Sequence, residues 1–338
     1  MKGVNRLDRI KLVQVGLGPI GIAAVAEAMR RRNLDLLGGI DVDPALEGKD
    51  VGVLVGGEPS GRVVRSDLPS ALAEWKPQAA VLTTVSQVER LASTVETLVS
   101  RGVNVVSSSE ELLVAARRAP EAAARLDRLA KETGVSVVAA GVNPGFMMDL
   151  LPVFLTAMCR RVEKVQVWRC QDAGKRRVSL QRKVGAGLSA EAFRAGEAEG
   201  WIGHKGLQES LALLCEGLGW QPERLEETLE PILADIPLKT KFAQIAPGDV
   251  AGVHHIGRAW KGTRLLAELD LRMYVGAERS YDRVCIEGDP PIDVTVEGGI
   301  PGDGATVAAL LNAVPLVVHA TPGLLSPLSL PIPRGMGV

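Results

Sequence analysis

Along the first 141 residues, apolar runs of strand length alternate with segments whose apolar positions recur at helical spacing. Helices are predicted at residues 22–32, 88–100, 110–118 and 121–133, and strands at 11–15, 34–41, 79–85, 103–109 and 135–141. Strands that are apolar along their length and alternate with helices are typical of a parallel sheet covered on both faces. The first part of the chain is therefore predicted to be a Rossmann-type, doubly wound α/β domain.

The pattern changes after "GVNPGF", residues 141–146, where proline and glycine mark a turn between domains. Helices are predicted at 189–199 and 206–217, and are followed by strands without helices between them, at 226–236, 249–260, 263–274, 283–287 and 292–297. Another strand of period two precedes the basic stretch 175–183. These features predict a second α+β domain with a mixed, largely antiparallel sheet.

Composition restricts the function. The 338 residues carry a formal net charge of -1, so no basic surface suggests a nucleic-acid partner. The four cysteines include no C-x-x-C pair and the histidines lack metal-ligand spacing, so we expect neither disulfides nor a metal site, and a reducing cytoplasm fits the chain.

Two apolar stretches could be mistaken for targeting or membrane segments. The start of the chain is better explained as a strand, a glycine turn and a helix than as an export signal. Residues 304–333 contain no charged side chain, but Pro315 and Pro322 would break a helix spanning a membrane. A buried helix at 305–313 followed by a loop-rich tail is predicted instead.

The turn after the first strand reads "GLGPIG" and fits G-x-G-x-x-G at Gly16, Gly18 and Gly21, with Pro19 and Ile20 between the last two glycines. Gly16 permits a tight turn, Gly18 lets the backbone approach a pyrophosphate, and Gly21 allows close packing of helix on strand. The N–H groups at the start of the helix would face the anion. A tight turn in a core is the alternative, but the order strand, turn, helix favours dinucleotide binding.

Asp41 ends the next strand, 25 positions after Gly16, where a carboxylate can accept hydrogen bonds from the adenosine ribose. The alternative is a surface acid before the Asp43-Pro44 turn. A carboxylate there repels a 2'-phosphate, so NAD is favoured over NADP. NADP stays possible because Lys49, or an arginine from elsewhere, could approach in the fold.

In a doubly wound sheet, ligands bind beyond the carboxyl ends of the strands. The loops expected to meet at the nicotinamide contain Thr83 and Thr84, residues 107–111, and Asn143 with Pro144. Glu110 and Glu111 are the candidate acid/base pair, and Ser109 is a plausible N-cap for the helix they open. Acids in a first helical turn also stabilise the helix dipole without any further role.

The second domain offers fewer signals. His204 lies in the glycine-flanked turn "GWIGHKG" and is a candidate for the substrate pocket. The basic residues at 175–183 form either a solvated loop or a carboxylate clamp. His254 and His255 are consecutive in a strand, so they should point to opposite faces and cannot share a metal ion.

The chain resembles the amine dehydrogenase group that includes 2,4-diaminopentanoate dehydrogenase and is related in fold to dihydrodipicolinate reductase. The resemblance rests on "GLGPIG", "GIDVDP", "GKDVG", "SSSEEL", "GVNPGFMMDLLP", "VGAGLSAEAFRAG", "GHKGLQES", "FAQIAPGDVAGVHHIG" and "PRGMG", which span nearly the whole chain. It implies that residues 303–338 return to complete a nucleotide domain of residues 1–143. It also implies that residues 144–302 bind substrate and form a homodimer.

The resemblance implies reversible, NAD(P)-dependent deamination of a small amine or diamino acid to a carbonyl compound and ammonia. The matching "EEL" places the acid/base at Glu110 or Glu111, and Glu110 is preferred because it is nearer the strand end. Ser109 stands where the group more often has cysteine. The substrate candidates are Phe146, Met147, Arg169, Arg176, Arg177 and His204.

Two alternatives remain open at this point. One is an imine or keto reductase acting on another metabolite, although the dihydrodipicolinate reductase motif "DAPSGTA" is absent from the sequence. The other is a non-catalytic NAD-binding sensor.

Overall fold

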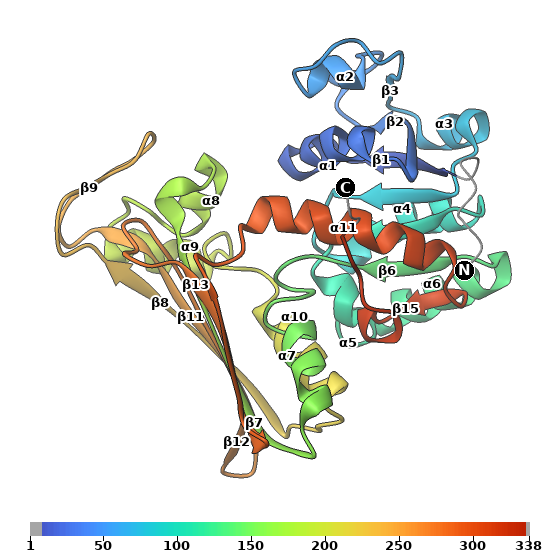
Figure 1. The fold of residues 1–338 in the computed structure, drawn as a ribbon. Coiled ribbons are helices and arrows are strands. Elements are labelled where there is room, and N and C mark those ends of the chain that lie inside the picture. The colour runs from blue at the N-terminus through green and yellow to red at the C-terminus, as the bar shows by residue number, and fades with distance from the viewer. Residues whose placement is uncertain (1–8, 336–338) are drawn as a thin grey trace. The chain divides into compact units, whose positions relative to one another are not determined.

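The computed structural model describes residues 9–335, and the chain divides into two compact units (Figure 1). Unit 1 comprises Met1–Gly145 and Gly302–Val338, and unit 2 comprises Phe146–Pro301. The first boundary lies two residues later than predicted, after 145 instead of 143, and the second lies one residue earlier. The final segment of the chain is part of unit 1; of the "PRGMG" motif, Met336 and Gly337 lie outside the described residues.

Unit 1 is built on a parallel sheet in the order β15-β6-β5-β4-β1-β2-β3, which confirms the Rossmann-type prediction. The strands are β1 (Ile10–Val15), β2 (Leu34–Ile40), β3 (Val64–Arg65), β4 (Ala79–Leu82), β5 (Asn104–Ser107), β6 (Ser136–Ala139) and β15 (Gly323–Leu325). The chain runs outward from β1 to β2 and β3, and then from β4 in the other direction. The adjacent strands β1 and β4 therefore form the switch point where α/β sheets bind ligands.

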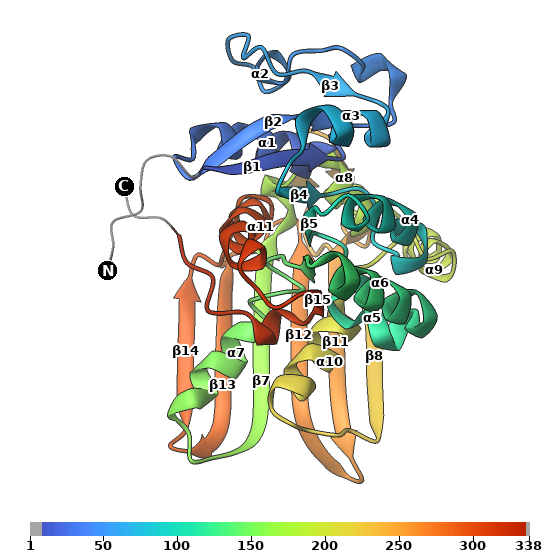
Figure 2. The same ribbon diagram turned by 90° about the vertical axis from the view of Figure 1, so that its right-hand side faces the viewer.

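Helices cover both faces of this sheet. They are α1 (Pro19–Arg30), α2 (Val51–Leu54), α3 (Leu68–Trp75), α4 (Val88–Val99), α5 (Ala115–Arg118), α6 (Pro120–Thr133) and α11 (Gly302–Val318), with 3-10 turns η1 (Pro44–Leu46), η2 (Glu111–Val114) and η5 (Pro327–Ser329). Helix α11 packs on α1 and on the strands from β4 to β6, whereas α4 and α6 pack together on the opposite face (Figure 2). The strands are consequently buried on both sides, as their continuous apolar sequences require.

The prediction that the C-terminal helix ends at residue 313 was wrong. Helix α11 continues through Pro315 to Val318. Proline removes one helical hydrogen bond, but Leu310, Val314 and Val317 lie in the core of unit 1 on either side of it, and that burial holds the helix together. No helix in the described part of the chain is long and apolar enough to cross a membrane.

Unit 2 contains a mixed sheet in the order β14-β13-β7-β12-β11-β8. Its strands are β7 (Arg161–Asp172), β8 (Arg224–Leu233), β11 (Val250–Lys261), β12 (Arg264–Tyr274), β13 (Tyr281–Asp289) and β14 (Ile292–Glu297). Only the β12–β7 pair among these described strands is parallel, so the predicted largely antiparallel sheet is confirmed.

Unit 2 also contains short helices and a second, two-stranded sheet. They are α7 (Leu150–Leu155), η3 (Thr156–Met158), η4 (Ala173–Lys175), α8 (Val178–Lys183), α9 (Ala190–Ala198), α10 (Leu207–Gly217) and the small ribbon of β9 (Leu238–Lys239) and β10 (Gln244–Ile245). Helix α10 packs against β11, β12 and α7. In the basic stretch 175–183, considered above as a solvated loop or a carboxylate clamp, residues 178–183 form the short helix α8.

One carboxylate organises the loop between α2 and β3 in unit 1. Asp50 accepts hydrogen bonds from the backbone N–H groups of Gly52, Ser60 and Gly61, and from the Ser60 hydroxyl. These donors stabilise the charged form, and the hydrogen bond from Ser60 is the main reason that the pKa of Asp50 falls to about 2.

We predict that this interaction makes the stability of unit 1 depend on pH. Because the folded pKa lies below the unfolded value of 3.8, the stabilisation is complete above about pH 4 and is lost as the pH falls through about 2. The melting temperature of Asp50→Asn should lie below that of the wild type from pH 5 to 7, and the difference should shrink toward pH 2. Asp235→Asn, at an exposed position, is the control, and a difference that does not change with pH would contradict the prediction.

Candidate functional site in the parallel-sheet unit

Three glycines make the turn between β1 and α1 possible. Gly16 has a φ of +89°, and a Cβ there would lie 2.7 Å from the Thr83 carbonyl oxygen. A Cβ on Gly21 would lie 1.9 Å from the Gly16 carbonyl oxygen, so helix and strand could not approach. A Cβ on Gly18, by contrast, would meet no atom within 4 Å. Gly16 and Gly21 are thus required by the protein's own packing, whereas Gly18 borders open space.

This open space lies at the start of α1. Gly18 is the N-cap, Pro19 occupies the first helical position, and the first turn contains no acidic residue. The helix begins with the hydrogen bond from the Ile22 N–H to the Gly18 carbonyl. The N–H groups of Ile20 and Gly21 precede the intrahelical pattern and are the donors that a helix start offers to an anion. The turn therefore fits a pyrophosphate.

The side chains of Gln14 and Thr83 hold this turn in place, a contact that the sequence did not predict. Gln14 is 2 % exposed in β1, and its Nε2 donates to the Gly16 carbonyl at 2.9 Å and to the Thr83 Oγ1 at 2.8 Å. Thr83 Oγ1 also donates to the Gly16 carbonyl at 3.0 Å. Thr83 therefore fixes the turn, while Thr84 follows it at the exposed surface. The sequence signal for Gln14 is a polar residue inside the apolar run "KLVQV".

Asp41 lies beside the same turn at the end of β2. Its Oδ2 accepts from the Leu17 N–H at 2.6 Å, and its Oδ1 accepts from the Asp43 N–H at 2.9 Å. The Val42 side chain next to it is 88 % exposed. A carboxylate held at the glycine turn, with an exposed apolar side chain beside it, fits an adenosine ribose and its base.

The arginine that contacts the backbone of Asp41 is paired with carboxylates. The Arg65 carbonyl accepts the Asp41 N–H, but the Arg65 guanidinium lies 4.0 Å from Glu47 and 3.5 Å from Glu74. Lys49 is exposed in the loop after η1. The local charge is therefore dominated by carboxylates.

The two candidate catalytic acids have different environments. Glu111 Oε2 accepts the Val88 N–H at 3.0 Å and so caps the start of α4, while the Glu111 N–H donates to the Ser86 carbonyl. Within residues 9–335, by contrast, no hydrogen bond or ion pair engages the half-buried Glu110 carboxylate. The structure thus separates two neighbouring acids that sequence position alone could not.

The expected N-cap role of Ser109 was wrong. The 3-10 turn η2 begins after Glu110, and no side-chain oxygen caps it. Ser109 is 2 % exposed, and its hydroxyl donates to the Ser86 carbonyl at 2.6 Å. The Ser109 side chain therefore fastens the loop after β5 to the loop after β4, with Glu110 next to the anchor. On the neighbouring strand β6, the half-buried Asn143 and the buried Pro144 follow the carboxyl end.

In unit 2, Arg169 does not present a free guanidinium. The side chain is 4 % exposed, and it donates to the Asp282 carboxylate and, at 2.7 Å, to the Ile300 carbonyl. Asp282 in turn accepts the Ile300 N–H at 2.7 Å. Burial lowers the pKa of Arg169, and the neighbouring Asp282 opposes that shift. The expectation of a carboxylate clamp at Arg169 is therefore replaced by a structural ion pair.

The other substrate candidates come from several segments of unit 2. Arg176 is half-buried and Arg177 is exposed between η4 and α8, where buried Gln181 donates to the Arg176 carbonyl at 2.9 Å. His204 is half-buried in the turn before α10. Phe146 is half-buried and packs edge-on against Phe154.

Met147 is 3 % exposed and belongs to the core. A hydrogen bond that the sequence did not predict joins the motifs "GVNPGFMMD" and "GHKGLQES". The Ser210 hydroxyl of α10 donates to the Asp149 Oδ2 at 2.7 Å, and both residues are fully buried.

His254 and His255 are consecutive residues of β11. His254 Nε2 lies 3.1 Å from Asp270 Oδ2, whereas the buried His255 reaches Glu227. The two rings therefore have different partners. Within residues 9–335, no cluster of three or more histidine, cysteine, aspartate or glutamate side chains could hold a metal ion.

A glycine turn at the switch point of a parallel sheet, joined in one chain to a largely antiparallel second unit, defines the class of two-domain, dinucleotide-dependent oxidoreductases. Comparison with known proteins narrows the class. The 2,4-diaminopentanoate dehydrogenase C-terminal domain matches residues 146–337, more than half of the chain. The chain therefore belongs to this family.

Relatives match over nearly the whole chain. A 2,4-diaminopentanoate dehydrogenase of Acetoanaerobium sticklandii is 28% identical over 98% of this chain and 96% of its own length. The structure of an amine dehydrogenase from Mycobacterium smegmatis superposes with a TM-score of 0.84 at 24% identity, covering 98% of both chains. Dihydrodipicolinate reductase from Paenisporosarcina sp. TG-14 has a TM-score of 0.51 at 12% identity, covering 93% of this chain and 96% of that one. The resemblance inferred from the motifs is confirmed.

The geometry of the glycine turn predicts the outcome of a single substitution. Gly18→Ala should leave the melting temperature unchanged, because its Cβ enters open space and its φ of −64° suits alanine. The same Cβ would point to where a pyrophosphate approaches, so the Kd for NAD should rise at least about tenfold. Gly304→Ala, also next to open space, is the matched control. Isothermal titration calorimetry measures the Kd for NAD of both variants. Unchanged binding by Gly18→Ala would contradict the assignment.

The ion pair of Arg169 gives a second prediction. Asp282→Asn leaves a buried guanidinium without its counter-charge and should lower the free energy of unfolding by about 3–5 kcal/mol. Asp293→Asn removes the exposed partner of Arg283 and should cost at most about 1 kcal/mol. Urea denaturation of both variants makes the comparison. Equal losses would mean that the Arg169 pair is not structural.

Proposed function

We propose that the chain catalyses the reversible, NAD-dependent oxidative deamination of a small amine or diamino acid to a carbonyl compound and ammonia. The observation that carries the proposal is the Glu110 carboxylate, which no described side chain or backbone group engages. It follows β5 at the same edge of the sheet as the glycine turn, two strands away, about 10 Å by strand spacing. The family and the amine dehydrogenase relatives support this reading.

The residues of unit 1 fit NAD. Gly18 and the first N–H groups of α1 would hold the pyrophosphate, Asp41 the adenosine ribose, and Thr84 and Asn143 the nicotinamide end. Asp41 and the carboxylates that occupy Arg65 favour NAD over NADP, because a 2'-phosphate would meet negative charge. When bound, NAD accepts a hydride from the substrate carbon.

Glu110 supplies the proton chemistry in this proposal. An ammonium group has no lone pair to assist hydride loss, so the substrate must first lose a proton. A carboxylate that forms no hydrogen bond within the protein can pair with the ammonium ion and then accept its proton. After hydride loss, water adds to the resulting iminium carbon and ammonia leaves. In the reverse direction the same carboxyl group returns the proton to the amine.

Unit 2 contains the other residues that we propose for substrate binding. Phe146 and His204 are its half-buried candidates, and Arg176 or Arg177 could pair with a substrate carboxylate. Met147 is buried, and we propose that it packs beneath these residues without contacting the substrate. The homodimer and the cytoplasmic location also stay predictions; sedimentation velocity would test the first.

Separate substitutions of the two acids test the proposal. Glu110→Gln should lower kcat for amine oxidation at least about 100-fold, since a general base is removed, and leave the Kd for NAD unchanged. Glu111→Gln should keep most of the activity and lower the melting temperature, because its carboxylate caps α4. Reduced nicotinamide is followed at alkaline pH with 2,4-diaminopentanoate and a panel of small amines.

Two results would contradict the proposal. Full activity of Glu110→Gln would remove the assigned base. Failure of the wild type to oxidise any amine, while NAD still binds, would favour a different reductase or a nucleotide sensor.

A further inference from the structure

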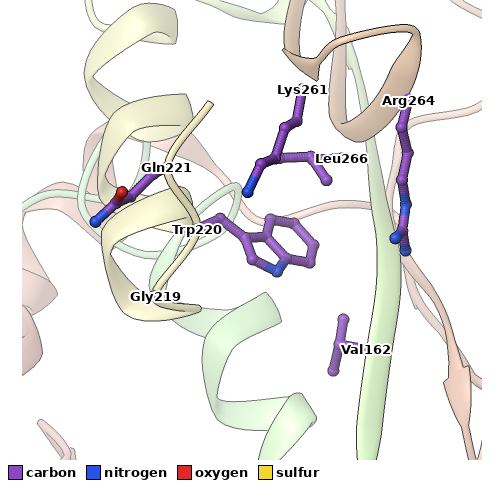
Figure 3. A pocket seen from close by; sticks show the side chains of 7 residues that line it. All are labelled: Val162, Gly219, Trp220, Gln221, Lys261, Arg264 and Leu266. Carbon is purple, nitrogen blue, oxygen red and sulfur yellow. The ribbon is translucent and has the colours of Figure 1, made fainter. Parts of the chain in front are cut away.

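Unit 2 contains a surface hollow of about 300 Å³ that the proposed chemistry does not use (Figure 3). It lies where the loop after α10 meets the hairpin between β11 and β12 and the amino end of β7. The residues that line it are Val162, Gly219, Trp220, Gln221, Lys261, Arg264 and Leu266. Its volume is at the lower end of the range for small-molecule sites.

The lining combines an apolar base with a cationic rim. Trp220 and Val162 are half-buried and Leu266 is 6 % exposed, whereas Lys261 and Arg264 are exposed. Figure 3 shows the Trp220 indole in the middle of the hollow, with the Lys261 side chain directed toward it and Arg264 on the other side. The lining contains two cations and no carboxylate.

Backbone hydrogen bonds hold the walls in place. The Trp220 N–H donates to the Cys215 carbonyl at 2.8 Å at the end of α10, and the Arg264 Nη2 donates to the Glu163 carbonyl at 2.9 Å. The nearby Glu223 carboxylate accepts the Gly262 N–H at 3.0 Å in the hairpin turn and is not part of the lining. The Trp220 backbone and the Arg264 guanidinium are therefore anchored before any ligand arrives, which lowers the entropic cost of binding.

A neighbouring hollow differs in the charges of the residues that line it. It shares Val162 and Arg264 with the first, but its lining includes Glu163 and Glu287. These acids pair with Arg161 and Lys164, respectively. Of these two hollows, the one that contains the indole has no carboxylate in its lining.

We propose that the Trp220 hollow binds a small organic anion with a flat apolar body, such as an aromatic carboxylate. The flat body would lie against the indole, and the anionic group would pair with Lys261 and Arg264. The assignment concerns unit 2 alone and does not depend on the proposed dehydrogenase activity.

Benzoate and its neutral analogue benzamide are the probes. The chain has five tryptophans, so a spectrum of ¹⁵N-labelled indole N–H groups has few signals, and Trp220→Phe identifies the one from Trp220. We expect benzoate to shift the Trp220 signal in a saturable manner, with a Kd at least about tenfold below that for benzamide. Added sodium chloride should weaken the binding of benzoate.

Variants test the contribution of charge. Lys261→Gln should weaken benzoate binding about tenfold, and Lys261→Arg should retain most of it. Lys241→Gln, at an exposed position in the turn between β9 and β10, is the matched control and should bind like the wild type. Lys261 lies in an exposed hairpin, so its variants should fold.

Three outcomes would overturn the proposal. Equal affinities for benzoate and benzamide would identify an apolar crevice without anion selectivity. Unchanged benzoate binding by Lys261→Gln would remove the assigned cation. A Trp220 signal that does not move with either probe would mean that the hollow binds no ligand of this class.

Discussion

The close approach of α1 to β1 is the constraint on which the candidate site depends. Gly21 lies against the Gly16 carbonyl, at a separation that no side chain can occupy. The same carbonyl accepts hydrogen bonds from Gln14 and Thr83, so the turn is tied to two neighbouring strands. This packing aims the first N–H groups of α1 outward at the switch point. A position for an anion follows from backbone geometry before any side chain binds the ligand.

The carboxylates of unit 1 differ in the hydrogen bonds that they accept from the backbone. Asp41 accepts the Leu17 N–H, Asp50 closes a loop through several N–H groups, and Glu111 caps α4. Each of these carboxylates accepts a hydrogen bond from a backbone N–H group and so has a role in the fold. Glu110 has no such bond in the described part of the chain, which leaves it available to a substrate cation. Hydrogen bonding, and not residue type, therefore separates these three acids from Glu110.

The cations of unit 2 also differ, in burial and in whether a carboxylate pairs with them. Arg169 is buried on a central strand, where an unpaired charge would be very costly, and Asp282 and the Ile300 carbonyl compensate it. Through Ile300, this pair also fixes the chain shortly before it returns to unit 1 as α11. Lys261 and Arg264, in an exposed hairpin, can keep their charge without a carboxylate because water solvates them. Burial thus decides which cations serve the fold and which can meet a ligand.

Much of the architecture was determined by the sequence itself. Apolar runs alternating with helical segments predicted the parallel sheet, and "GLGPIG" predicted its turn, because both depend on contacts between residues near in sequence. Long-range packing decided the rest. Burial of Leu310 and Val317 carries α11 through Pro315, and Asp282, more than a hundred residues after Arg169, turns an expected clamp into an ion pair. The choice between Glu110 and Glu111 likewise required the fold, because only the tertiary structure brings the Val88 N–H to one of them.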